Sequence, residues 1–199
     1  MNLLRGAEYQ RYYSATKREA LTFYDLNLSA QDHQTFFTCE TDKDRPADMI
    51  MVSAWRERLV SARIESAKSA LELVPDCPSA LILLGEEDAT TVTEAEQYFQ
   101  KAQVGAEARY KRSLNFYNQA NARQGEQEMK RDHTVLIYVK RRLAMCWRKL
   151  GRVKEAAKMF KELTKEPPNV NWLNASLGEN LIECYVELGD YANEHVMYK

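Results

Sequence analysis

Histidine and cysteine are the residue types best suited to acid–base, nucleophilic or metal chemistry, and this sequence has few of either. Its three histidines, His33, His133 and His195, lie far apart, with no ligand or acid–base spacing to one another. Its four cysteines are equally dispersed and never form Cys-x-x-Cys. The sequence therefore predicts no metal site and no cofactor.

No motif of a common catalytic or nucleotide-binding class occurs in the chain. Gly-x-Ser-x-Gly, His-Glu-x-x-His, the P-loop and Gly-x-Gly-x-x-Gly are all missing. One catalytic alternative stays open, because side chains distant in sequence can meet in a fold. It is a helical enzyme with a site assembled near residues 20–40, where Tyr24, Asp32 and His33 lie. Otherwise we expect that the protein is not an enzyme.

A binding surface is the function that the sequence favours instead. If residues 137–150 form the first helix of a hairpin in a solenoid, the concave side of that helix bears Tyr138, Arg141, Met145 and Arg148. Two arginines beside an aromatic residue and a methionine suit an acidic peptide. We therefore predict a groove that binds a protein or peptide, with acidic peptides as the candidates that the arginines favour, and we expect no nucleic acid.

The first helix of the last unit, from about Trp172 to Leu188, offers carboxylates at the matching positions of this groove. Glu179 and Glu183 occupy them, and both are assigned to the predicted groove. They also give Arg141 and Arg148 a second interpretation, in which the arginines form ion pairs with the glutamates of the neighbouring hairpin. The sequence leaves both interpretations open.

The charge distribution supplies a third functional hypothesis. The chain carries a formal net charge of −1, which gives no global electrostatic reason to bind nucleic acid or a membrane surface. From Lys130 to Lys165, however, there are twelve basic residues against three acidic ones. This local excess leaves open an alternative in which a basic face binds acidic lipid or nucleic acid.

Helices must position these side chains, because no alternating strand pattern persists in the sequence. Residues 137–168 contain two amphipathic stretches separated by Gly151, and the second carries Ala156 and Phe160 on its apolar face. The same step from a small to an aromatic residue recurs at Ala95 and Phe99. Such recurrence is typical of stacked helical hairpins. The predicted fold is all-α, a tetratricopeptide-like helical-hairpin solenoid.

This pattern divides the chain into four segments. They are an aromatic-rich N-terminal cap at residues 1–45, two helical hairpins at 46–104, a polar insertion at 105–133, and a hairpin followed by an incomplete hairpin at 134–199.

The insertion follows from the distance between the two Ala–Phe steps. Ala95 and Ala156 are 61 residues apart, about 27 more than one repeat of roughly 34 residues. We expect a lengthened helix or helices and an exposed loop near Gly125. The last hairpin stops at Lys199 in the middle of a unit, which predicts that the chain is a piece of a longer protein.

The sequence contains no signal for a membrane. No apolar run approaches the roughly 20 residues that span a bilayer, and the N-terminus lacks the apolar region of a signal peptide. We therefore expect this segment to be soluble and cytoplasmic.

Several strings that are not generic tetratricopeptide consensus carry a resemblance to a known family. They are RGAEYQRY, FYDLNLSAQDHQTFFTC, RPADMIM, SAWRER, EAEQYF and YVKRRLAMCWRKLGRVKEAAKM. Together they resemble the central portion of the suppressor of tumorigenicity 7 proteins over nearly the whole chain. The resemblance implies a multi-pass membrane protein with a proposed tumour-suppressing role, no established catalytic activity and a soluble, helical central region. Membrane association is then expected only through parts of the full-length protein that are absent here.

Overall fold

The computed structural model describes residues 46–119, 125–166 and 171–190, without the side chains of residues 171–176. All regular elements within these ranges are helical, which confirms the predicted all-α class. The chain divides into two compact units, Met1–Val139 and Lys140–Lys199, and helix α7 (Glu126–Lys149) runs across the division. The predicted N-terminal cap at residues 1–45 lies outside the described residues.

The first described hairpin joins α3 (Pro46–Ala54) to α4 (Val60–Leu73). Proline suits the first turn of α3 because backbone N–H groups in that turn have no acceptor within the helix, so the N–H that proline lacks is not needed. Met51 of α3 and Ala67 and Ala70 of α4 are fully buried in one apolar cluster. Alanine lets the two helix backbones approach closely, while methionine fills the remaining space.

The second hairpin begins with α5 (Pro78–Leu83), whose six residues are all buried. One turn of π-helix, η3 (Leu84–Asp88), follows it and leads to α6 (Val92–Gln119), which packs against both. Ala95 and Phe99 of α6 are buried. The small-then-aromatic step that the sequence shows therefore lies on the face of α6 that meets its neighbours.

Helix α6 starts with a capping box. The N–H of Glu94 donates to Thr91 Oγ1 at 3.2 Å, and the Glu94 carboxylate accepts from the N–H groups of Thr90 at 2.8 Å and Thr91 at 3.3 Å. Hydrogen bonds from the Thr90 hydroxyl and N–H, with a smaller one from Thr91, hold the pKa of Glu94 below its ordinary value of 4.5. The start of α6 is therefore fixed by local polar contacts.

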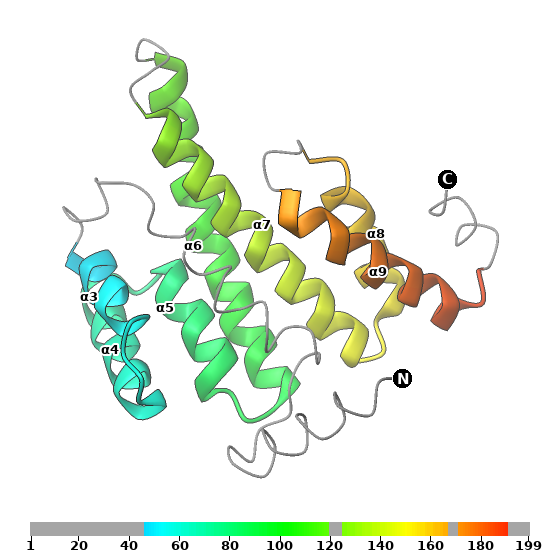
Figure 1. Ribbon diagram of the computed structural model, residues 1–199, viewed down its shortest axis with the longest axis horizontal. Coiled ribbons are helices and arrows are strands. Elements are labelled where there is room, and N and C mark those ends of the chain that lie inside the picture. The colour runs from blue at the N-terminus through cyan, green and yellow to red at the C-terminus, as the bar shows by residue number, and fades with distance from the viewer. Residues whose placement is uncertain (1–45, 120–124, 167–170, 191–199) are drawn as a thin grey trace. The chain divides into compact units, whose positions relative to one another are not determined.

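Within the first unit, the second half of α6 and the first half of α7 run antiparallel, side by side (Figure 1). The residues predicted as a polar insertion, 105–133, lie on these two helices and on the connection between them. Gly105 permits a close approach, because a Cβ at that position would lie 2.0 Å from the carbonyl oxygen of Asp76. A glycine is therefore required where α6 passes the connection that precedes α5.

The second unit contains the end of α7, α8 (Val153–Leu163) and α9 (Asn171–Leu188). Gly151, with φ +79°, adopts the left-handed conformation that ends α7 and starts the turn to α8. Helix α8 packs against α9. Its Ala156 and Phe160 are completely buried, so the step seen at Ala95 and Phe99 recurs here.

Among the helices described, none is both long enough and apolar enough to cross a membrane.

Candidate functional site

Tyr138, the first residue of the predicted groove, belongs to the first unit and is buried there. Its side chain is 1% exposed, and its hydroxyl donates a short hydrogen bond to the carboxylate of Glu86 on η3. This hydrogen bond connects α7 to the π-helical turn η3, so the hydroxyl of Tyr138 has its partner within the fold.

Arg141 and Met145 lie on the part of α7 that belongs to the second unit. Each is 2% exposed. A guanidinium so deeply buried stabilises a fold only when polar groups surround it. Both side chains are therefore part of the interior and do not contribute exposed surface to the groove.

Arg148 is the accessible basic residue of the predicted groove. Its Nε donates to Glu187 Oε1 at 2.9 Å, and its Nη1 forms a short ion pair with Glu183. Burial acts to lower the pKa of Arg148, but the carboxylates of Glu183 and Glu187 outweigh it and raise the pKa. Of the two interpretations of Arg148, the structure shows the ion pair, which Arg148 forms with Glu183 and Glu187 of α9.

The acidic members of the groove share one face of α9. Glu179 and Glu183 are both exposed, and Glu179 forms no ion pair with any residue that the structure describes. Glu187 extends the same face by one further turn, since it follows Glu183 at a spacing of four residues. Glu187 lies outside the predicted groove because it matches neither Arg141 nor Arg148, although its spacing of four residues from Glu183 is visible in the sequence.

The basic run from Lys130 to Lys165 does not form a single surface. Arg131 and Arg142 are buried, as is Arg141. Lys130 pairs with Glu126 of the preceding turn at 2.6 Å. The exposed basic residues that follow α7 are therefore the remaining candidates for a basic binding face.

Three of these residues make a row along α8, and a fourth lies in the turn that follows the helix; we call the four the lysine row. Its members are Lys154, Lys158 and Lys161 of α8, and Lys165, two residues beyond the end of α8, all exposed. Successive spacings of four and three residues place the three helical members on one side of the helix. None of them forms an ion pair with another part of the described chain. The opposite side of α8 holds the buried Ala156 and Phe160.

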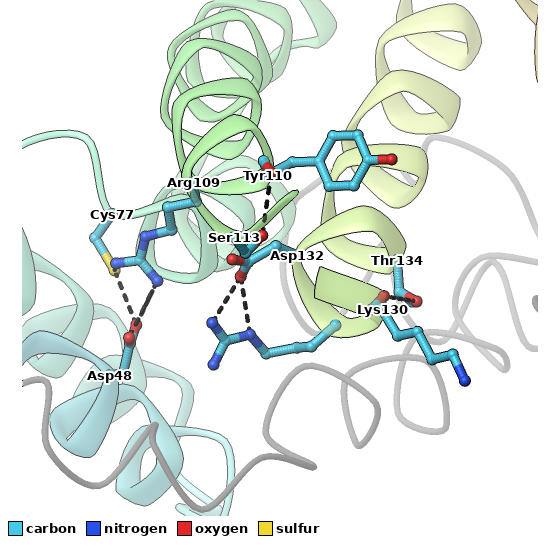
Figure 2. A network of polar contacts seen from close by, with 9 residues as sticks. Asp48, Cys77, Arg109, Tyr110, Ser113, Lys130, Asp132 and Thr134 are labelled. Carbon is cyan, nitrogen blue, oxygen red and sulfur yellow. Dashed lines mark hydrogen bonds and ion pairs between the residues drawn. The ribbon is translucent and has the colours of Figure 1, made fainter. Parts of the chain in front are cut away.

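A buried polar site that the sequence did not reveal lies in the first unit (Figure 2). Asp48 of α3 is 2% exposed, and its two carboxylate oxygens accept from Arg109 Nη1 at 2.8 and 3.1 Å. Cys77 Sγ lies 3.9 Å from Asp48 Oδ1 and 3.8 Å from Arg109 Nη2. Burial by itself lowers the pKa of Arg109, but Asp48, Cys77 and a more distant Asp132 raise it overall. The arrangement links α3, the start of α5 and α6.

The neighbouring contacts in Figure 2 are local to single helices. Ser113 Oγ donates to the Tyr110 carbonyl at 3.1 Å, and Thr134 Oγ1 donates to the Lys130 carbonyl at 2.8 Å. Such bonds from hydroxyl groups to the preceding turn are common inside helices. These contacts support a structural role for the network.

The structure describes only part of the residues suited to chemistry. His133 lies against Tyr110, with 4.9 Å between ring centroids, whereas His33 and His195 lie outside the described residues. Tyr24 and Asp32, the other residues of the catalytic alternative, also lie outside them. In the parts of the chain that the structure describes, no group of three or more potential metal ligands occurs.

The described cysteines are free and buried. Cys184 illustrates the effect of that environment: burial raises the pKa of its thiol to about 11, although the nearby Arg148 acts to lower it. A thiol with such a pKa is almost entirely protonated at neutral pH and is a poor nucleophile.

Comparison with known proteins identifies similar chains. A family model described as ST7 protein matches residues 1–199. A suppressor of tumorigenicity 7 protein-like chain of Gallus gallus is 53% identical over 193 residues, covering 97% of this chain and 34% of the relative. The Homo sapiens protein of that name is 52% identical over 191 residues, covering 96% and 32%. A Drosophila melanogaster chain named Protein ST7 homolog is 52% identical over 197 residues, covering 99% and 36%.

The chain thus spans about a third of the length of the relatives it matches. No solved structure matches it.

Proposed function

This chain belongs to the suppressor of tumorigenicity 7 family, and we propose that it is a non-catalytic helical-repeat scaffold that binds protein partners. The observation that carries the proposal is a repeated packing step. Ala95 and Phe99 on α6, and Ala156 and Phe160 on α8, have the same spacing, and all four are buried. Two helices in different units of the chain thus bury the same pair of side-chain types at the same spacing.

Repetition of this kind supports a tetratricopeptide-like solenoid. A single hairpin cannot bury its apolar face alone, so hairpins of this type stack and create an extended surface for partners. The packing of α3 on α4, of α5 on α6 and of α8 on α9 supplies the hairpin-like pairs that such an arrangement requires. Specificity then comes from a few exposed side chains and not from a reaction centre.

We assign the partner-binding role in the second unit to the exposed Glu179 and Glu183 and the partly exposed Arg148 of the predicted groove. Arg148 and Glu183 neutralise each other, so together they offer a partner a polar contact with little net charge. Glu179 adds an acidic side chain that no described residue neutralises. This surface suits a protein partner with a basic or polar contact region.

The test is affinity capture with the full 199-residue chain as bait, comparing Glu179→Lys with Glu72→Lys. Both glutamates are exposed, and neither forms an ion pair with a described residue, so each variant changes the surface charge equally without breaking a known contact. Glu72 lies on α4 in the first unit and is therefore the matched control.

We expect proteins that wild type and Glu72→Lys retain and Glu179→Lys loses, and these proteins should then bind the purified wild-type chain directly. Identical sets of captured proteins from both variants would remove the assignment of Glu179. Capture of no protein above background would contradict the scaffold role itself.

A further inference from the structure

We propose that the lysine row of α8 binds an acidic segment of a partner protein. The proposal rests on the scaffold function proposed above, to which it adds a second surface and the chemical class of a partner. At 100° per residue, the three lysines on α8 lie within about 60° of one another around the helix axis, and they extend over about 10 Å. Each turn of α8 thus presents one ammonium group along a narrow line.

None of the four lysines forms an ion pair within the described part of the chain that would explain its position. The exposed Glu155 beside the row pairs with Arg152 at 3.4 Å and not with a lysine. Helix α8 is held instead through its opposite side, where Ala156 and Phe160 are fully buried. The charged side of the helix is therefore free to serve a partner.

The arrangement of the row also disfavours an isolated helix. Lysines three and four residues apart repel one another along a helix. Lys154 stands in the first turn, where the helix dipole disfavours a positive charge, whereas only Lys161 lies in the last turn, where the dipole favours one. Helix stability thus does not account for the whole row. An acidic ligand would relieve the repulsion among all four charges.

The surroundings of the row favour a polypeptide over a lipid surface. Glu155 and Glu162 form a second line about 80° around the helix from the lysines. A broad anionic membrane surface would meet both lines and be repelled by the glutamates. The apolar side chains that an interfacial helix would insert into a membrane, such as Phe160, are buried in the fold. A narrow acidic segment can follow the lysines alone.

The proposal is tested with a fluorescein-labelled, alanine-rich peptide whose four glutamates follow the same four-three-four spacing. Its binding to the full chain is measured by fluorescence anisotropy at low salt, for wild type and for the Lys158→Glu/Lys161→Glu variant. The control is Lys101→Glu/Lys111→Glu, which makes the same change in net charge at exposed lysines of α6 that have no described ion pair. Circular dichroism confirms that each variant is folded, and Lys158→Gln/Lys161→Gln replaces the first variant if that one does not fold.

We expect the α8 variant to lose at least roughly tenfold in affinity and the control less than about twofold, since charges at the contact dominate those elsewhere. The Lys158→Glu/Lys161→Glu variant should also bind a peptide with lysines in place of the glutamates better than wild type does. Equal losses in the α8 variant and the control would show that only net charge matters and would overturn the proposal.

Vesicles containing phosphatidylserine provide the other decisive measurement. If wild type binds these vesicles through Lys158 and Lys161 but does not bind the glutamate peptide, the partner is a membrane and the proposal is wrong. That failure would leave the scaffold function intact as long as Glu179→Lys still loses captured proteins. Conversely, peptide binding through the lysine row without any effect of Glu179→Lys would overturn the assignment of Glu179 alone.

Discussion

The contact between Asp48 and Arg109 and the outer side of α8 use charge in opposite ways. In the first, both side chains are largely buried, at 3% and 13% exposure, and each neutralises the other. On α8 the lysines are exposed and have no described acidic partner. Yet α6, which carries Arg109, and α8 both bury an alanine and a phenylalanine four residues apart. The same buried pair of residues thus occurs in a helix with a buried ion pair and in a helix whose exposed lysines have no described ion-pair partner.

The largest effect is expected when the buried pair is broken. Asp48→Ala leaves the guanidinium of Arg109 in the interior without its carboxylate, which should lower the free energy of unfolding by about 3–5 kcal/mol. Urea denaturation followed by circular dichroism measures this loss. The double variant Asp48→Ala/Arg109→Met removes both charges and should recover most of the stability. A loss below about 1 kcal/mol in the single variant would mean that solvent reaches Arg109 and that the contrast with α8 is weaker than the geometry indicates.

A smaller effect on stability is expected when a larger residue replaces the alanine of the buried alanine–phenylalanine pair that α6 and α8 both contain. Ala156 is completely buried, so Ala156→Leu should lower the free energy of unfolding by roughly 1–3 kcal/mol. Lys158, two residues further on, is exposed. Lys158→Leu should therefore change the free energy of unfolding by no more than about 0.5 kcal/mol. Thermal and urea unfolding of the two variants compare the sides of α8 directly. Equal stabilities would show that Ala156 is not at a tight helix contact.

The parts of the fold that could be predicted from the sequence are those with local causes. The Ala156–Phe160 step, with a spacing of four residues, identifies the buried side of a helix by itself. Gly151 likewise identifies the turn after α7, since the left-handed conformation there suits glycine. These features need no knowledge of distant residues.

The parts that could not be predicted depend on distant residues. Asp48 and Arg109 are separated by 61 positions, and neither has a neighbour in sequence that reveals the pairing. Tyr138 was assigned to an exposed groove from its place on a helix, but that place does not reveal that Glu86 lies opposite its hydroxyl. Helical periodicity shows which residues share a side, whereas exposure also depends on what packs against that side.

The ion pairs of Arg148 are intermediate in exposure between the buried Asp48–Arg109 pair and the exposed lysines of α8. Breaking them should therefore lower the free energy of unfolding only modestly. The Arg148 side chain is 21% exposed, but those of Glu183 and Glu187 are 53% and 40% exposed. Arg148→Ala should therefore lower the free energy of unfolding by no more than about 1 kcal/mol, and less at high salt. A double-mutant cycle with Glu183→Ala, at low and high salt, measures the pairing. A coupling above about 2 kcal/mol that salt does not reduce would place Arg148 with Asp48 and Arg109 among the buried pairs.

The smallest effect is expected at Glu94, whose charge lies at the start of α6 and is fully exposed. Its folded pKa is below the ordinary value of 4.5 because Thr90 and Thr91 donate hydrogen bonds to the carboxylate. Because the pKa of Glu94 is lower in the folded than in the unfolded protein, its charged carboxylate stabilises the fold. This stabilisation is fully present above the unfolded pKa and is lost as the pH falls through the folded pKa. Wild type should therefore be slightly more stable than Glu94→Gln near pH 7, and the difference should shrink as pH falls well below 4.5. Urea midpoints of both chains across this range, with an NMR titration of the Glu94 carboxyl, measure the effect. The amide oxygen of glutamine can accept the same hydrogen bonds but carries no charge. A stability difference between wild type and Glu94→Gln that stays constant with pH would therefore show that the charge of Glu94 does not cause the capping effect.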